Sequence, residues 1–129
     1  MAPLILVLDD DQSILDLYQL VLEEEGYRVH LTKLSFEKVQ EVETLHPDLI
    51  LLDLKMDGHT DGFLLLQKLK MYRPTKDIPV ILCTAGLEMI QKQEEIYRQK
   101  GIPILYKPFD LGELLALVRQ ALSPNKEGR

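Results

Sequence analysis

Side chains that suit phosphate chemistry follow four apolar runs of this 129-residue sequence. They are a pair of aspartates, a single aspartate, a threonine and a lysine, namely Asp9 and Asp10, Asp53, Thr84 and Lys107. Three neighbouring carboxylates repel by about 1 kcal/mol per pair in water, and their oxygens favour a hard cation such as Mg2+ or Mn2+. A hydroxyl and an ammonium bind anionic oxygens, and a carboxylate can act as a nucleophile. Together these are the parts that phosphoryl transfer needs.

The apolar runs before these residues are typical of strands buried in a parallel sheet. They cover residues 4–8, 49–52, 78–83 and 102–106, whereas residues 27–32 alternate between apolar and polar as an edge strand does. Helical patterns lie between the strands and after the last one. They start at Asp11 or Ser13, at Ser35, at Asp61 or Gly62, near residue 87, and at Asp110.

Strand and helix alternate five times, which predicts one α/β domain with a parallel sheet covered on both faces. We expect a flavodoxin-like, doubly wound sheet of five parallel strands in the order 2-1-3-4-5, with five helices. In such sheets the groups that follow the carboxyl ends of the strands meet at one edge. The chemical residues are therefore expected to converge there.

Apolar stripes predict which helical side chains face the sheet. The first helix is expected to bury Ile14, Leu17, Tyr18, Val21 and Leu22, and the last helix Leu111, Leu114, Leu115, Val118 and Leu122. The helix over roughly residues 87–99 is polar nearly all round. We expect it to pack lightly and to move most.

Composition narrows the class of protein. The net charge of -6, from 21 acidic and 15 basic residues, argues against binding of a nucleic-acid backbone by this domain alone. One cysteine excludes an internal disulfide, and no targeting segment is seen, so a cytoplasmic protein is expected. Residues 3–122 read as the domain. Residues 123–129 read as a flexible C-terminal tail or as the start of a linker; a free-standing protein and an excised domain both fit.

Four motifs carry a resemblance to a known family. They are LVLDDD at 6–11, PDLILLDLKM at 47–56, PVILCTA at 79–85 and KPF at 107–109. The chain resembles the response-regulator receiver domain of two-component signalling over essentially its whole length. The resemblance implies a phosphoprotein of a phosphorelay, which catalyses only its own phosphorylation and dephosphorylation and is not otherwise an enzyme.

The resemblance also implies a role for each site residue. Asp53 is the expected phosphoacceptor, with Thr84 and Lys107 binding the phosphoryl oxygens. Asp10 and Asp53 are the expected direct ligands of Mg2+ (or Mn2+). Asp9 is expected to act largely through water, and the backbone carbonyl of Lys55 to complete the set. The Lys107–Pro108 bond is expected to be cis, so that the lysine points into the site.

Partners and switching follow from the same resemblance. The implied donor is a phosphohistidine of a sensor histidine kinase or of a phosphotransfer protein. The added charge is expected to alter the surface of the fourth helix, fifth strand and fifth helix. That surface would contact a downstream protein or an output domain. No membrane partner is expected.

Two departures from the family pattern affect the expected mechanism. Asp57 stands where the family usually has proline, and the loop that contains His59 is one residue longer. The aromatic residue that commonly lies three positions before the lysine is replaced by Ile104, and Tyr106 follows on the same face of the strand. Tyr106 is expected either to pack or to take a shifted switching role, and packing is favoured.

Other functions remain open from the residues themselves. A receiver fold could serve as an interaction module without phosphorylation. A small aspartate-dependent phosphatase would use Asp9, Asp11 and Ser13, but it leaves Asp53 without a task. A flavodoxin-type FMN carrier needs a phosphate loop after the first strand, where three aspartates would repel phosphate.

Asp11 is also expected to cap a helix.

Overall fold

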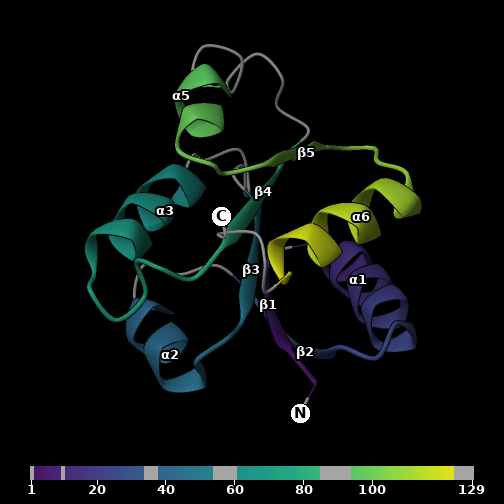
Figure 1. The fold of residues 1–129 in the computed structure, drawn as a ribbon. Helices are drawn as coiled ribbons and strands as arrows, with labels where there is room; N and C mark the ends of the chain where they lie inside the picture. Colours follow the sequence, from purple (N-terminus) through teal and green to yellow (C-terminus); the bar gives the residue numbers. More distant parts are fainter. Residues whose placement is uncertain (1, 10, 34–37, 54–60, 85–93, 124–129) are drawn as a thin grey trace.

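The computed structural model describes residues 2–9, 11–33, 38–53, 61–84 and 94–123. Its elements are β1 (Leu4–Leu8), α1 (Gln12–Glu24), β2 (Arg28–Thr32), α2 (Lys38–Leu45), β3 (Leu49–Asp53), α3 (Asp61–Met71), β4 (Val80–Thr84), α5 (Glu94–Gln99), β5 (Ile104–Tyr106) and α6 (Leu111–Ala121) (Figure 1). Within these segments no helix has the length and apolar character needed to cross a bilayer.

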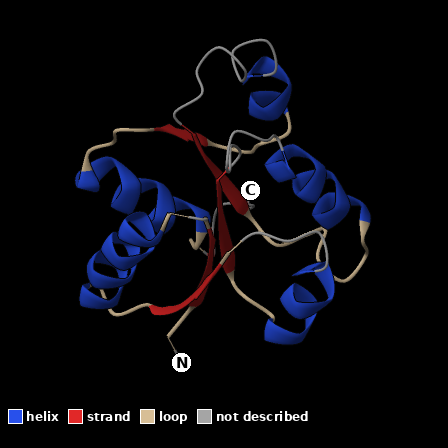
Figure 2. Cartoon of the chain, turned by 180° about the vertical axis from the view of Figure 1, so that it is seen from behind, coloured by secondary structure: helices blue, strands red, loops and turns tan. Residues whose placement is uncertain are grey.

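All five strands are parallel and lie in the order β2-β1-β3-β4-β5, as predicted. Helices α1 and α6 cover one face, and α2, α3 and α5 cover the other (Figures 1 and 2). The expected doubly wound α/β fold is therefore confirmed.

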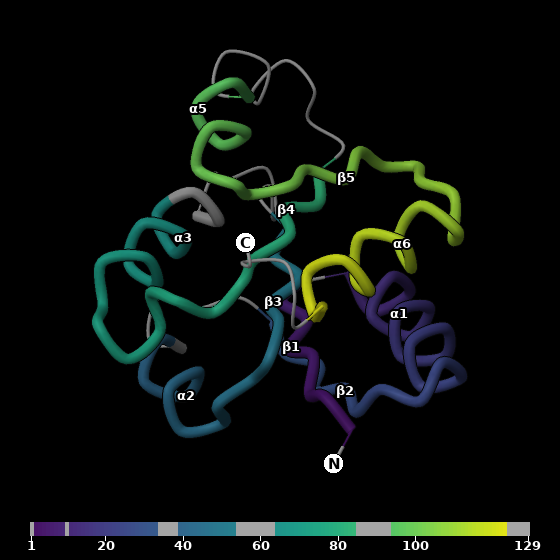
Figure 3. The backbone as a smooth tube through the Cα atoms, viewed as in Figure 1, coloured from purple at the N-terminus to yellow at the C-terminus, as the bar shows by residue number. Residues whose placement is uncertain are grey.

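The central strands are buried from end to end, which explains their unbroken apolar sequences. Every residue of β3 and of β4 is buried, and both strands run through the middle of the molecule (Figure 3). At the edge, β2 exposes Arg28 and His30 and half-buries Val29 and Leu31, which is the alternation seen in the sequence. The two patterns therefore predicted the place of these strands correctly.

Polar caps define the ends of two helices. Asp11 is the N-cap of α1 and accepts a hydrogen bond from the amide of Ser13, while Asp110 caps α6 through the amide of Gly112. After α1, Gly26 takes a φ of 92°, a left-handed conformation that glycine adopts without steric cost. The capping role expected of Asp11 is confirmed.

Two inward residues were predicted wrongly. Leu17 is exposed, because it lies roughly 100° around α1 from the centre of the buried stripe, whereas the neighbouring Leu15 is buried. Leu111 is exposed because it is the first residue of α6, where the packed stretch of the helix has not begun. Leu114 and Val118 are buried as expected.

Helix α5 packs lightly, as its polar sequence predicts. No residue of its described part, Glu94–Gln99, is buried. Tyr97 of this part is partly buried and packs against the core. The predicted start of this helix, near residue 87, lies outside the described residues. The last strand is shorter than expected, since β5 begins at Ile104 rather than at residue 102.

Candidate functional site

The carboxyl ends of four strands bring together most of the residues singled out in the sequence. Asp9 follows β1, and Asp53 ends β3 directly opposite Cys83 of β4. Thr84 ends β4, and its carbonyl oxygen accepts a hydrogen bond of 2.8 Å from the amide of Lys107. Asp9, Asp53 and Thr84 are buried. The predicted convergence at this edge is therefore observed for four residues.

Asp10 and Lys55 lie outside the described residues. Their predicted parts in a metal site consequently stay predictions, as do the roles of Asp57 and His59 in the following loop. The site described below consists of Asp9, Asp53, Thr84 and Lys107.

Alternation along the strands decides which face each side chain lies on. The residues of β1, β3, β4 and β5 that share the phase of Asp9 and Asp53 pack against α1 and α6. Cys83 belongs to this set, and Lys107 continues the same phase beyond Leu105. The lysine therefore approaches the two carboxylates from the same side of the sheet.

Lys107 joins the two carboxylates. Its Nζ atom donates a hydrogen bond of 3.0 Å to Oδ2 of Asp9 and lies 3.6 Å from Oδ2 of Asp53. Only 17% of the lysine side chain is exposed, and both carboxylates are more deeply buried. In such a site the Coulomb attraction is less screened than at the surface. One partly buried ammonium thus lies between two buried carboxylates.

The surroundings of Lys107 change its pKa in two opposing ways. Burial works to lower the pKa, but the negative charges of Asp53 and Asp9, with the hydrogen bond to Asp9, outweigh it. The pKa of Lys107 is therefore raised above its usual value. The side chain is a fixed positive charge at neutral pH.

Backbone contacts hold Asp9 in place. Its Oδ1 atom accepts a hydrogen bond of 3.0 Å from the amide of Asp11, and its own amide donates one of 3.2 Å to the carbonyl of Thr32. With Oδ2 bound to Lys107, both oxygens of the carboxylate have partners. The Lys107–Pro108 bond is cis, as expected.

The donors of this edge suit a magnesium ion. The carboxylates of Asp9 and Asp53 and the ammonium of Lys107 together carry one net negative charge. The carboxylates offer only oxygen atoms as metal ligands, and oxygen is the ligand that a hard cation prefers. The described part of the chain holds no group of three acidic, histidine or cysteine side chains arranged around one point. A complete site consequently needs further donors, such as the predicted Asp10 and Lys55.

Sequence reasoning missed the contacts among the side chains beneath the site. Tyr18 of α1 is buried, its ring stacks on Phe109 with centroids 5.8 Å apart, and its hydroxyl has no hydrogen bond of ordinary geometry to the described residues. The hydroxyl lies close to the thiol of Cys83, and burial raises the pKa of both groups, that of Cys83 to about 12. The sequence shows that Cys83 shares the phase of Asp53, but it does not show that Tyr18 reaches this thiol.

Tyr106 belongs to the opposite face. It is partly buried with Ile104 against the core beneath α3 and α5, so the prediction that the two residues share a face is confirmed. Burial raises the pKa of Tyr106, and the nearby carboxylate of Glu94 on α5 adds to the effect. Tyr106 therefore packs against the core beside α5, while its switching role stays a prediction.

Comparison with known proteins gives a consistent result. The family described as "Response regulator receiver domain" matches residues 5–119. The chain is 33% identical to sporulation initiation phosphotransferase F of Bacillus subtilis, over 92% of each chain. It is 40% identical to the DNA-binding dual master transcriptional regulator RpaA of a Synechocystis species, over 93% of this chain, and it spans about half (49%) of that protein.

A solved structure shares the fold. It is the receiver domain of a Pseudomonas aeruginosa sensor histidine kinase, which has a magnesium ion coordinated in its active-site cleft. The TM-score is 0.78 with 24% identity, and the match covers 95% of this chain and 98% of that one.

Proposed function

The chain belongs to the response regulator receiver domain family, and from this premise we propose that Asp53 accepts a phosphoryl group from a phosphohistidine. Receiver domains are signalling modules rather than classical enzymes. In this proposal the donor is a sensor histidine kinase or a phosphotransfer protein, and the chain works in the cytoplasm. It acts on a downstream protein or on an output domain.

The observation that carries the proposal is the position of Lys107 between Asp9 and Asp53. The ammonium of Lys107 lies 3.6 Å from Oδ2 of Asp53. From this position it can also contact an oxygen of a phosphoryl group attached to that carboxylate. The buried Asp9 holds this ammonium through a hydrogen bond of 3.0 Å. A phosphatase that used Asp9 as its nucleophile would leave Asp53 without a task.

The chemical step needs a nucleophile, an anion partner and a donor. A carboxylate oxygen of Asp53 attacks phosphorus, the new P–O bond forms, and the P–N bond to the donor histidine breaks as the imidazole leaves. Lys107 pairs with one phosphoryl oxygen, and the hydroxyl of Thr84 donates to another. Asp9, Asp10, Asp53 and the carbonyl of Lys55 would hold Mg2+. The ion supplies charge neutralisation at the phosphoryl oxygens.

Signalling follows from the competition for Lys107. A phosphoryl group adds about two negative charges beside Asp53 and draws the ammonium away from Asp9. Lys107 directly follows β5, and Tyr106 before it lies close to the carboxylate of Glu94 of α5. A shift at Lys107 is thus passed to β5, to the lightly packed α5 and to α6. This is the surface that we propose to change.

Chemical phosphorylation tests the proposal. The protein is incubated with Mg2+ and acetyl phosphate, and the intact mass is measured. One phosphoryl group is expected on the wild type and on Asp77→Asn, a matched change of an exposed aspartate far from the site, and none on Asp53→Asn.

A second measurement addresses the interaction-module alternative. Beryllofluoride with Mg2+ mimics the phosphoryl group and is expected to change amide exchange in β5 and α5. A wild type that gains no phosphoryl group and shows no response to beryllofluoride would contradict the proposal and favour a phosphorylation-independent module.

A further inference from the structure

A groove lies between α3 and α5, away from the carboxylate site. Its volume is about 740 Å3, with walls that include Leu64, Lys70 and Met71 of α3, Ile96 and Tyr97 of α5, and Lys100. Leu66 and Ile102 contribute to its lining from the core. None of the residues of the carboxylate site lines this α3–α5 groove.

Large apolar side chains in the walls of the α3–α5 groove are strongly exposed to solvent. Leu64 is 48% exposed, Met71 82% and Ile96 50%. The described part of the chain has six large exposed apolar side chains. Leu64, Met71 and Ile96 are three of these six, and all three line this groove. Apolar side chains gathered in this way, rather than scattered singly, mark a contact surface.

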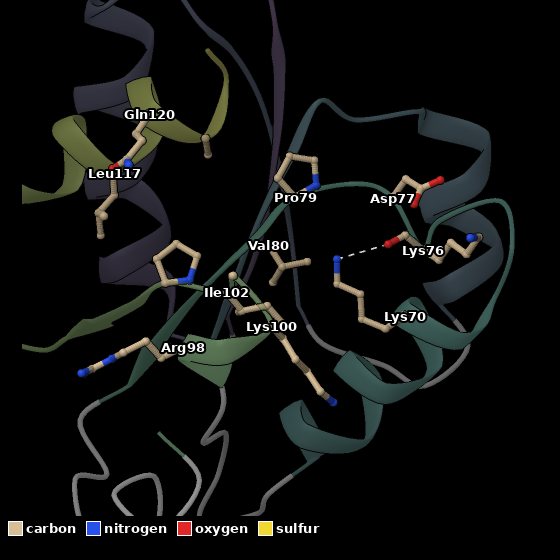
Figure 4. Close-up of a pocket in the computed structure, with 13 residues that line it drawn as sticks. Lys70, Lys76, Asp77, Pro79, Val80, Arg98, Lys100, Ile102, Leu117 and Gln120 are labelled. Atoms are coloured by element: carbon tan, nitrogen blue, oxygen red, sulfur yellow. Dashed lines mark hydrogen bonds between the residues drawn. The ribbon is translucent and has the colours of Figure 1, made fainter. Parts of the chain in front are cut away.

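The charges around the α3–α5 groove are positive. Lys70, Lys76 and Lys100 line it, and no acidic side chain does so among the described residues, although the whole chain carries a net charge of -6. An adjoining cavity of about 540 Å3 shares these three lysines and adds Arg98, with Asp77 as its acidic residue (Figure 4). The lysines thus form a local basic region on an acidic protein.

The three lysines differ in how firmly their side chains are held in place. The ammonium of Lys70 donates to the carbonyl oxygen of Lys76 at 3.3 Å (Figure 4) and to that of Ile78 at 3.0 Å, so its charge is held at the groove. Lys76 and Lys100 are exposed. They can reach acidic groups on a partner whose apolar side chains enter between Leu64, Met71 and Ile96.

We propose that the α3–α5 groove docks an acidic amphipathic helix of a partner protein. Apolar side chains at helical spacing would fill the space between α3 and α5, and carboxylates beside them would pair with Lys76 and Lys100. A nucleic acid would not use the exposed leucine, methionine and isoleucine, and the net charge of the chain opposes it. This docking does not require phosphorylation at Asp53, and it goes beyond the proposed receiver function.

Selection from a random peptide library tests the occupant. A library of displayed peptides of about sixteen residues, long enough for four helical turns, is selected on the wild-type chain without Mg2+ or a phosphoryl donor. The enriched peptides are expected to carry apolar residues at i, i+3 or i+4, and i+7, flanked by Asp and Glu. Circular dichroism of a synthetic winner with the protein should show added helix.

Matched variants locate the binding. Lys100→Glu and Met71→Ser are expected to raise the Kd of the winning peptide by about tenfold, the effect of losing one anchor. Lys33→Glu and Leu20→Ser make the same changes at exposed positions outside the groove and are expected to alter the Kd by less than about twofold. All four positions are exposed, so the variants should fold, which thermal unfolding checks.

Four outcomes overturn the proposal. They are the absence of any enriched peptide, enriched peptides that are basic or uncharged, equal binding to all four variants, and competition by inorganic polyphosphate at the same concentration as the peptide. Sedimentation of the chain alone distinguishes a further occupant. A dimer that Met71→Ser abolishes and Leu20→Ser does not would assign the groove to a second copy and contradict a partner helix.

Discussion

The Nζ atom of Lys107 and the Oδ2 atom of Asp9 lie 3.0 Å apart, although 98 positions of the sequence separate the two residues. This contact connects β1 to the segment after β5, across two intervening strands. It positions one cation beside Asp53, and the behaviour of the site depends on it.

Removal of the ammonium should destabilise the domain. Lys107→Met keeps the length of the side chain but leaves two buried carboxylates without their shared cation. We expect the free energy of unfolding at pH 7 to fall by about 2 kcal/mol in urea titrations. Lys33→Met, at an exposed position, is the matched control and should change it by less than about 0.5 kcal/mol.

The pH dependence of this loss has a definite sign. The pKa of Lys107 is higher in the folded chain than in the unfolded chain, so its contribution is fully present below the usual lysine value of about 10.4. The contribution is lost as the pH rises through the raised pKa of the folded state. The difference between the wild type and Lys107→Met should therefore begin to shrink as the pH rises above about 10.4, and it should vanish above the raised pKa. A difference that stays constant up to pH 12 would contradict the raised pKa of Lys107.

Lysine and magnesium should compete for the same carboxylates. Because Lys107 neutralises part of the charge of Asp9 and Asp53, Lys107→Met is expected to bind Mg2+ several-fold more tightly than the wild type. Isothermal titration with MgCl2 measures this affinity. Asp53→Asn should weaken it in both backgrounds, and an affinity of Lys107→Met equal to or below that of the wild type would contradict the competition.

Tyr18→Phe should stabilise the domain, because it removes the buried hydroxyl beneath the site. The ring stack on Phe109 is retained, and a buried hydroxyl without a hydrogen bond of ordinary geometry is removed. We expect the free energy of unfolding to rise by about 1 kcal/mol, with Tyr27→Phe as the control at a half-buried tyrosine. A loss of stability would show instead that the thiol of Cys83 is a true hydrogen-bond partner.

Tyr106→Phe separates packing from switching. The change removes the hydroxyl that lies close to Glu94 and keeps the ring, so amide exchange in α5 should become faster while global stability stays within about 1 kcal/mol. If Tyr106 only packs, beryllofluoride should produce the same change in exchange on β5 and α6 in both proteins. A response lost in Tyr106→Phe but kept in Tyr72→Phe would support the switching role.

Local sequence patterns were sufficient for the strands and for most of the site. Asp53 and Thr84 could be placed because each directly ends an unbroken apolar run, and strand ends of a parallel sheet share an edge. The bond between Lys107 and Asp9 could not be predicted in the same way. It depends on the distance and direction between segments far apart in the chain.

Tertiary packing explains what the patterns missed. Tyr18 was predicted to be buried, but the sequence of α1 contains nothing to show that its hydroxyl meets Cys83 of β4. Leu17 and Leu15 are equally apolar, and only the orientation of α1 on the sheet decides which one is buried. The α3–α5 groove likewise arises from two helices that are separate in the sequence.

The two edge strands also govern how this protein can associate. β5 has three residues, so it offers few backbone groups to a strand of another chain, and β2 exposes Arg28 and His30 along the opposite edge. Short edges and outward charges discourage the addition of a further strand. Neither edge of the sheet therefore favours strand addition, which leaves the helical surfaces for contacts with other proteins.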